Sequence, residues 1–245
     1  MRLRVLCAVV ALVSCKEAPA RPAVRVAAAS DLTVACEAMR GGFEQQTGHR
    51  VDFVFGSSGQ LSKQLVEGAP YDLFAAANQA FTDPPIAAGA CSAETRAQYA
   101  EGQLVIFAPR EKVAGLAELI EPRFQRIALA NPELAPYGQA AKDALIRAGL
   151  WEALEPRLVY GQNVQQTFQL ARSGNVEAAL VSRSLAKQAV AVDPALYPPL
   201  KQSLVVCGGG KNPEGGRAFA AFVLSDEGRR VLAREGFGLP PKVAR

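Results

Sequence analysis

The stretch VRVAAASDLTVACEAMRGGF, residues 24–43, decides how the chain folds. Its first part, residues 24–29, is a short apolar run typical of a buried strand, and from position 32 onward apolar residues recur at the spacing of one helix face. Ser30 and Asp31 lie between these two parts, where either side chain can cap the start of a helix. The stretch therefore predicts a strand, a turn and a helix in succession.

The same arrangement recurs along the 245-residue chain. Further strands are predicted at residues 51–55, 71–76, 104–108, 127–130, 158–160, 178–181 and 204–207. Further helices are predicted after residue 59 and at residues 139–148, 164–173 and 216–235. Strands that alternate with helices throughout predict an α/β fold with mostly parallel sheets flanked by helices.

The middle of the chain has a self-contained pattern, which predicts an inserted second lobe. The chain is expected to cross between the lobes near residues 104–105 and 203–204, and these crossings would act as hinges. Residues 23–104 and 204–245 are thus assigned to the first lobe, and residues 105–203 to the second.

The N-terminus has the pattern of a bacterial export signal. Two arginines precede an apolar stretch, residues 5–13, that is too short for a membrane-spanning helix, which needs about 20 residues. The following LVSC, residues 12–15, resembles the lipobox of bacterial lipoproteins. That resemblance implies a signal peptide of residues 1–14, a lipid anchor on Cys15 and a tether of residues 15–22. Ordinary cleavage at the small residues that follow is the alternative.

The composition is that of an ordinary globular protein, with 49% hydrophobic and 20% charged residues. Loss of the signal would remove Arg2 and Arg4, leaving 25 basic and 23 acidic residues, so the mature chain is nearly neutral. The sequence has no lysine and arginine run and no basic stripe interleaved with aromatic residues. It therefore gives no indication of nucleic-acid binding.

Residues suited to catalysis are scarce. The one histidine, His49, is predicted to lie in a surface loop rather than to act as a general base. The sequence lacks a nucleophile elbow, a P-loop and a dinucleotide-binding motif, and the glycines at 208–210 predict a flexible loop. A binding protein is therefore favoured over an enzyme, and an α/β hydrolase or transferase is the less favoured alternative.

Three cysteines, Cys36, Cys91 and Cys207, lie in the folded part of the chain. They have neither CxxC spacing nor companion histidines, which argues against a metal site. At most one disulfide is possible, and the sequence does not say which. The prediction for each cysteine is a small buried side chain.

Small or polar residues recur where a predicted strand ends and a helix begins. Ser30, Ser57-Ser58, Tyr137-Gly138 and Val164 all hold such positions. The start of a helix presents unpaired N–H groups and the positive end of the helix dipole, so several starts that meet would bind an anion without a charged side chain. Ligands of open α/β sheets bind beyond the carboxyl ends of the strands, which is where these residues are placed.

Five segments resemble the periplasmic molybdate-binding proteins of ABC importers, and they occur in the family's order. They are AAASDL at 27–32, FGSSGQL at 55–61, GAPYDLF at 68–74, ANPE with APYG at 130–138, and LSDEG with GF at 224–237. The resemblance covers residues 24–237. It implies a two-lobe fold like that of type II periplasmic binding proteins, with a hinge between the lobes and an oxyanion bound in the cleft.

The resemblance also implies which residues hold the oxyanion. Ser30 and Ser58 match the two serines that offer hydroxyl groups, while Tyr137 and Val164 match positions that offer backbone N–H groups. Gly59, beside Ser58, is a possible additional contact.

The chain departs from the family pattern in one place. Ser182 stands where some members have a tyrosine whose hydroxyl reaches the anion, so Ser182 is a further possible contact. Asp31 is another, although its carboxylate is awkward beside a dianion and would then turn away while its N–H donates. An anion that keeps a proton needs an acceptor, and Asp31 is the one nearby candidate.

These observations predict a monomeric, lipid-anchored solute-binding protein of the periplasm or cell envelope. Its expected ligand is molybdate, with tungstate as a close match, and its expected partner is the permease of a molybdate ABC importer. No cofactor is expected, and molybdenum would be bound only as the oxyanion. Another oxyanion, such as sulfate or phosphate, is the alternative ligand.

Overall fold

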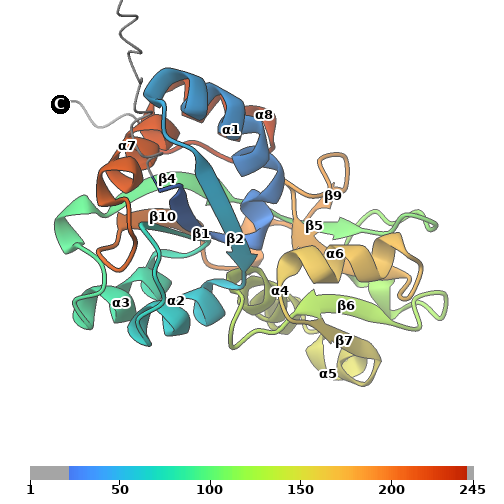
Figure 1. Ribbon diagram of the computed structural model, residues 1–245. Helices are drawn as coiled ribbons and strands as arrows, with labels where there is room; N and C mark the ends of the chain where they lie inside the picture. The colour runs from blue at the N-terminus through green and yellow to red at the C-terminus, as the bar shows by residue number, and fades with distance from the viewer. Residues whose placement is uncertain (1–21, 242–245) are drawn as a thin grey trace, which may run out of the picture.

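The computed structural model describes residues 22–241, which fold into two lobes that lie side by side (Figure 1). Each lobe is built on a five-stranded sheet. The two-lobe α/β prediction is confirmed. The predicted signal peptide, the lipidated Cys15 and most of the tether lie outside the described residues.

The sheet of the first lobe has the strand order β2-β1-β3-β10-β4. Strand β1 is parallel to its neighbours β2 and β3, whereas β10 is antiparallel to both β3 and β4. The strands are β1 (Val24–Ala29), β2 (Val51–Gly56), β3 (Leu73–Ala76), β4 (Ala97–Gly102) and β10 (Leu200–Val206).

The sheet of the second lobe has the order β7-β6-β8-β5-β9. Here β6 is parallel to β7 and β8, and β5 is antiparallel to β8 and β9. The strands are β5 (Leu104–Phe107), β6 (Ile127–Ala130), β7 (Leu158–Gly161), β8 (Ala178–Ser182) and β9 (Val190–Ala191). Each sheet is therefore mixed rather than mostly parallel, because β10 in the first sheet and β5 in the second run against the other strands.

The helices cover both faces of the first sheet and flank the second. Those of the first lobe are α1 (Thr33–Thr47), α2 (Ser58–Val66), α3 (Asp83–Ala87), α7 (Pro213–Leu224) and α8 (Asp226–Arg234). Those of the second are α4 (Pro136–Arg147), α5 (Trp151–Leu154) and α6 (Val164–Arg172). Short 3₁₀ turns complete the set: η1 (Ser30–Leu32), η2 (Gln79–Thr82), η3 (Ala93–Thr95), η4 (Leu116–Ile120), η5 (Glu155–Arg157) and η6 (Pro194–Leu196).

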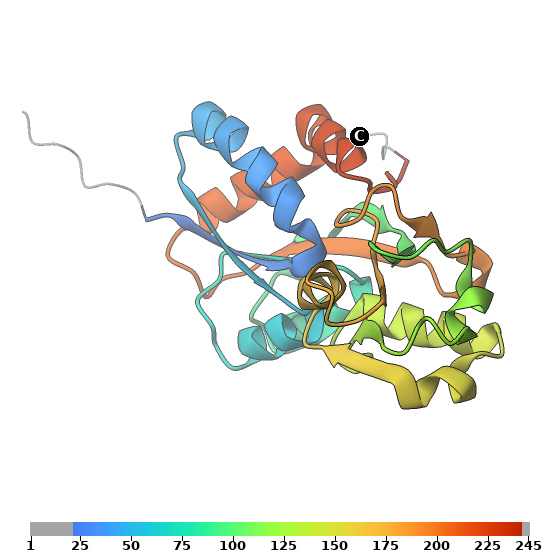
Figure 2. The same cartoon turned by 90° about the vertical axis from the view of Figure 1, so that its right-hand side faces the viewer.

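The chain ends in the lobe in which it begins, since α7 and α8 pack beside α1 in both views (Figures 1 and 2). The predicted single helix at 216–235 is in fact these two helices. Ser225 separates them because its Oγ accepts the N–H of Gly228 and thereby caps the start of α8. The predicted boundary at residues 203–204 falls inside β10, so the return crossing lies a few residues earlier.

Two local predictions are wrong. His49 is buried rather than on the surface: its ring packs against Phe43, and its Nδ1 lies 3.2 Å from Nδ2 of Asn212. Neither Ser30 nor Asp31 caps the helix that follows it through its side chain, since η1 and α1 begin without a side-chain cap.

The tertiary structure shows which cysteines form a disulfide. Cys91 and Cys207 form a disulfide between loops that are 116 residues apart, whereas Cys36 is a free, buried side chain as predicted. Within residues 22–241 no cluster of histidine, cysteine or acidic side chains could hold a metal ion. Over the same residues no helix is long and apolar enough to cross a membrane.

Candidate anion-binding site

A small cavity lies between the lobes. It lies where the carboxyl ends of β1 and β2 face the starts of α4 and α6, elements that Figure 1 labels. Its volume is about 10 Å³, the scale of one water molecule. The lobes are closed around it, since the N–H of Gln165 donates to Oγ of Ser30 and the N–H of Gly59 donates to the carbonyl oxygen of Leu134. The four residues predicted to hold an oxyanion all line it, two from each lobe. The complete lining is Ala29, Ser30, Asp31, Gly56, Ser57, Ser58, Ala77, Ala135, Pro136, Tyr137 and Val164.

Ser57 and Ser58 have different tasks at the start of α2. The Oγ of Ser57 accepts the N–H of Gln60 at 3.3 Å and so caps the helix. The Oγ of Ser58 accepts the N–H of Ala77 at 3.0 Å, and Ser58 is fully buried. Because its oxygen is engaged as an acceptor, the hydroxyl hydrogen of Ser58 is left to donate to an occupant of the cavity.

Ser30 lies at the end of β1 and faces the second lobe. Its Oγ accepts the N–H of Gln165, in the first turn of α6, at 3.4 Å. As with Ser58, the hydroxyl hydrogen is left to donate. Ser30 is 3% exposed, so a donor here acts in a site from which water is excluded.

The second lobe contributes helix starts rather than hydroxyl groups. Val164 is the first residue of α6, which is capped by Asn163, and Tyr137 follows Pro136 at the start of α4. The first N–H groups of a helix have no acceptor within the helix, so those of Tyr137 and Val164 are available at the cavity. Both residues are buried.

A glycine fixes the start of α4. A Cβ at Gly138 would lie 2.1 Å from the carbonyl oxygen of Ala130, at the end of β6. The helix therefore begins directly against the strand end, which places the Tyr137 N–H at the cavity. No larger residue fits there unless the backbone moves.

Asp31 is the one charged residue in the lining, and of the described lining residues none is lysine, arginine or histidine. Burial raises the pKa of Asp31 to about 6, although a hydrogen bond from Gln202 opposes the shift. Its Oδ2 accepts from Nε2 of Gln202 at 2.6 Å, and its Oδ1 has no hydrogen-bond partner among the described residues. The positive potential of the site thus comes from helix starts, not from basic side chains.

The other two candidates are engaged elsewhere. The N–H of Gly59 donates to the carbonyl oxygen of Leu134 at 2.8 Å, a contact between the lobes. The hydroxyl of Ser182 lies 2.8 Å from that of Ser184, which in turn donates to the carbonyl oxygen of Asp31. Ser182 is not among the residues that line the cavity.

Sequence reasoning missed the residues behind Asp31. Gln202 is on β10 and Tyr99 is on β4, both are fully buried, and the Tyr99 hydroxyl donates to Oε1 of Gln202 at 2.7 Å. Gln202 is 103 residues from Tyr99 and 171 residues from Asp31 in the sequence. No local pattern of spacing or composition marks such residues.

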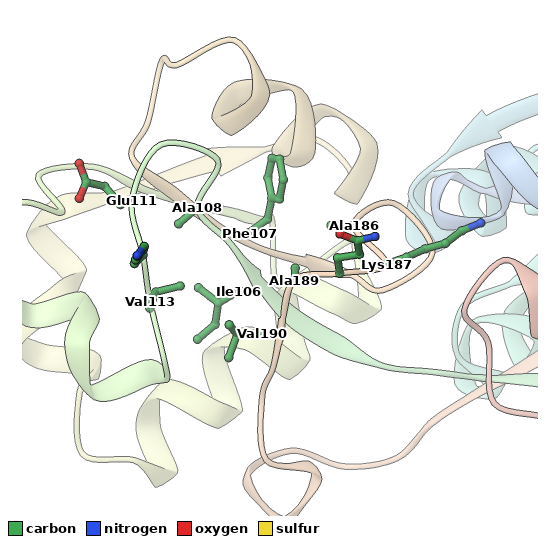
Figure 3. A pocket seen from close by; sticks show the side chains of 11 residues that line it. Ile106, Phe107, Ala108, Glu111, Val113, Ala186, Lys187, Ala189 and Val190 are labelled. Atoms are coloured by element: carbon green, nitrogen blue, oxygen red, sulfur yellow. The ribbon is translucent and has the colours of Figure 1, made fainter.

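A larger hollow of about 650 Å³ lies within the second lobe, between the end of β5 and the loop before β9. Figure 3 shows Ile106, Val113 and Val190 gathered along it, while Lys187 extends toward the first lobe, where it pairs with Glu235. No helix start faces this hollow among the residues that line it. It therefore lacks the convergent donors of the smaller cavity.

Known proteins share this architecture and sequence pattern. The family model of the bacterial extracellular solute-binding proteins matches residues 24–238. The chain belongs to the bacterial extracellular solute-binding proteins. This solute-binding protein is 30% identical over 226 residues to the molybdate-binding protein ModA of Azotobacter vinelandii, covering 88% of this chain and 90% of that one.

Two further similarities are close. The molybdate-binding protein ModA of Rhodobacter capsulatus is 29% identical to this solute-binding protein over 220 residues, which are 87% of each chain. A solved structure of the periplasmic molybdate-binding protein of Azotobacter vinelandii superposes with a TM-score of 0.83 at 26% identity, covering 89% of this chain and 100% of that one. The predicted resemblance to this family is thus confirmed.

Proposed function

We propose that this solute-binding protein captures molybdate in the cavity between its lobes and delivers it to the permease of an ABC importer. Tungstate, which has the same charge and nearly the same size, would bind as well. Ser30 and Ser58 would donate their hydroxyl hydrogens, and Tyr137 and Val164 their backbone N–H groups. The names of the relatives, whose sequences match nearly the whole folded part, support this ligand.

One observation carries the proposal. Two serine hydroxyls whose oxygens already accept N–H groups, and two helix starts from the other lobe, meet at one closed cavity without a basic side chain. Such a site offers donors in excess of acceptors, which suits a fully deprotonated oxyanion. A buried dianion is costly to desolvate, and these hydrogen bonds offset that cost.

The lining of serine hydroxyls and helix starts supports an inorganic anion over a sugar or a peptide. The cavity as it stands has the scale of one water molecule, so the lobes would separate slightly to admit molybdate. Sulfate is smaller than molybdate and would contact the donors of both lobes less well. Phosphate that keeps a proton needs an acceptor, and Asp31 is the only carboxylate in the lining. Selectivity would therefore rest on size first and on protonation second.

Calorimetric titration with molybdate, tungstate, sulfate and phosphate tests the proposal. We expect tight binding of molybdate and tungstate, weaker binding of sulfate, and the weakest binding of phosphate. Tighter binding of sulfate or phosphate would reassign the ligand. If none of the four anions gives heat, the anion-binding role is wrong.

The remaining parts of the proposal concern the cellular setting. The protein would act as a monomer without enzymatic activity, and lipid on Cys15 would hold it at a membrane of the cell envelope. Cys15→Ala should then release the protein from the membrane fraction of its native host. An unchanged membrane-bound fraction would contradict the anchor without affecting the ligand.

A further inference from the structure

Behind the anion cavity lies a buried polar cluster that is separate from the four proposed donors. Nε2 of Gln202 donates to Oδ2 of Asp31 at 2.6 Å and to the hydroxyl oxygen of Tyr137 at 3.2 Å. Oε1 of Gln202 accepts from the hydroxyl of Tyr99 at 2.7 Å. All four side chains are at most 2% exposed, so the cluster is shielded from water.

The cluster joins the two lobes. Asp31, Tyr99 and Gln202 belong to the first lobe, whereas Tyr137 comes from α4 of the second. When the lobes separate, the Tyr137 hydroxyl must leave Gln202. That separation breaks a buried hydrogen bond, so the cluster favours the closed state.

The first lobe is shaped to receive this hydroxyl. A Cβ at Gly102, the last residue of β4, would lie 2.3 Å from the hydroxyl oxygen of Tyr137 and 3.0 Å from Nε2 of Gln202. Gly102 also stands next to the crossing into β5. Because Gly102 has no side chain, the backbone beside the crossing leaves space for the Tyr137 phenol of the opposite lobe.

Asp31 is contacted by the second lobe at a further point. Its carbonyl oxygen accepts the hydroxyl of Ser184 at 2.8 Å. Asp31 is also adjacent to Ser30, one of the proposed hydroxyl donors. Contacts that hold Asp31 therefore also hold the segment that presents Ser30 to the cavity.

Tyr137 is the residue that links this cluster to the anion site. Its backbone N–H lies at the cavity, while its hydroxyl is bound inside the first lobe. We infer that Asp31, Gln202 and the Tyr137 hydroxyl form a latch that closes the lobes and positions the Tyr137 N–H against the anion. The inference rests on the proposed function. It makes Asp31 and Gln202 positioning residues that need not touch the ligand.

Tyr137→Phe tests the latch, because it removes the hydroxyl and keeps the backbone N–H. Molybdate affinity, measured by calorimetry, should fall about five- to tenfold, the effect of one buried hydrogen bond. Tyr160→Phe is the matched control, since Tyr160 lies in the second lobe and is 48% exposed; its affinity should match the wild type. Affinity of Tyr137→Phe within twofold of the wild type would overturn the latch.

A double-mutant cycle separates the latch from a general loss of packing. In a Gln202→Leu background the hydroxyl of Tyr137 has lost its donor, so Tyr137→Phe should cause little further loss of affinity. Fully additive losses would overturn the pairing of these two residues. Thermal unfolding of each variant verifies that it is folded at the titration temperature.

Small-angle X-ray scattering distinguishes failure of the latch from failure of the proposed function. If the wild-type protein gives no heat with molybdate, the proposed function is wrong. The latch is then tested by scattering from the ligand-free protein. The ligand-free radius of gyration should then be larger for Tyr137→Phe than for the wild type. Equal radii under that condition would overturn the latch as well.

Discussion

The two lobes face the same cavity with different chemistry. The first lobe presents hydroxyl groups, those of Ser30 and Ser58, whereas the second presents backbone N–H groups at the starts of α4 and α6. A hydroxyl can be deleted by one substitution, but a backbone N–H can be lost only if the backbone moves. Removal of a side-chain hydroxyl therefore tests the donors of the first lobe. Replacement of a glycine by a larger residue, which moves the backbone, tests the donors of the second lobe.

The largest effect is expected where the backbone of the second lobe is forced to move. Gly138→Ala would place a Cβ 2.1 Å from the carbonyl oxygen of Ala130, so the start of α4 must shift. We expect molybdate affinity to fall by more than about 100-fold and the melting temperature to drop, as for other overpacked sites. Titration and thermal unfolding measure the two effects.

Gly41→Ala is the control for this substitution, since a Cβ there meets no atom within 4 Å. It should leave affinity unchanged and should not lower the melting temperature. Wild-type affinity in Gly138→Ala would show that the start of α4 supplies no donor.

The next effect concerns the hydroxyl groups of the first lobe. Ser30→Ala and Ser58→Ala should each weaken molybdate binding about ten- to 100-fold, because a hydrogen bond to a charged group contributes roughly 1.5–3 kcal/mol. Calorimetry gives the affinities, and circular dichroism verifies the fold.

Ser57→Ala is the matched control in the same turn. Its hydroxyl caps α2, so the variant should lose about 1 kcal/mol of stability and keep its affinity. If Ser57→Ala loses as much affinity as Ser58→Ala, the assignment of the two serines is reversed.

A smaller effect should follow from pH. Asp31 is fully buried in the closed structure, and burial raises its pKa from an ordinary value of 3.8 to about 6. The closed state therefore takes up a proton. This proton stabilises the closed state fully below pH 3.8, and the stabilisation is lost as the pH rises through about 6. Affinity should be about tenfold higher at pH 5 than at pH 7.5, if Asp31 has its ordinary pKa when the lobes are open.

Asp31→Asn tests this assignment, because the variant cannot titrate at this position. The other ionisable groups near Asp31 are Cys36, Tyr99 and Tyr137, and burial raises the pKa of each, so they stay neutral across the range. Titrations with dilute molybdate at several pH values should give a flat profile for Asp31→Asn. A profile that still follows the wild type would assign the proton to another group.

The smallest effect is expected at Ser182. Its hydroxyl contacts Ser184 and does not line the cavity, so Ser182→Ala should weaken binding by no more than about threefold. The same titration measures it. A loss equal to that of Ser58→Ala would make Ser182 a ligand and would give the second lobe a hydroxyl donor of its own.

Much of the proposed site could be predicted because it consists of chain junctions. The motif FGSSGQL shows a strand that ends and a helix that begins, and such junctions occupy one edge of an α/β sheet. That reasoning brought Ser57-Ser58, Tyr137-Gly138 and Val164 together although they are far apart in sequence, and the family resemblance singled out Ser58. The reasoning from junctions misjudged the cap at residues 30–31, since Oγ of Ser30 accepts the N–H of Gln165 from the other lobe instead.

By itself, the sequence determined the alternation of strands and helices, the two lobes and the positions of the helix starts, because these follow from local apolar spacing and from the residues that end an element. Only the tertiary structure decided the mixed sheets, the buried state of His49, the Cys91–Cys207 disulfide and the cluster of Tyr99, Tyr137 and Gln202 behind Asp31. Each of these depends on contacts between residues that are distant in the chain. Their energies come from burial and pairing in three dimensions, which no local pattern encodes.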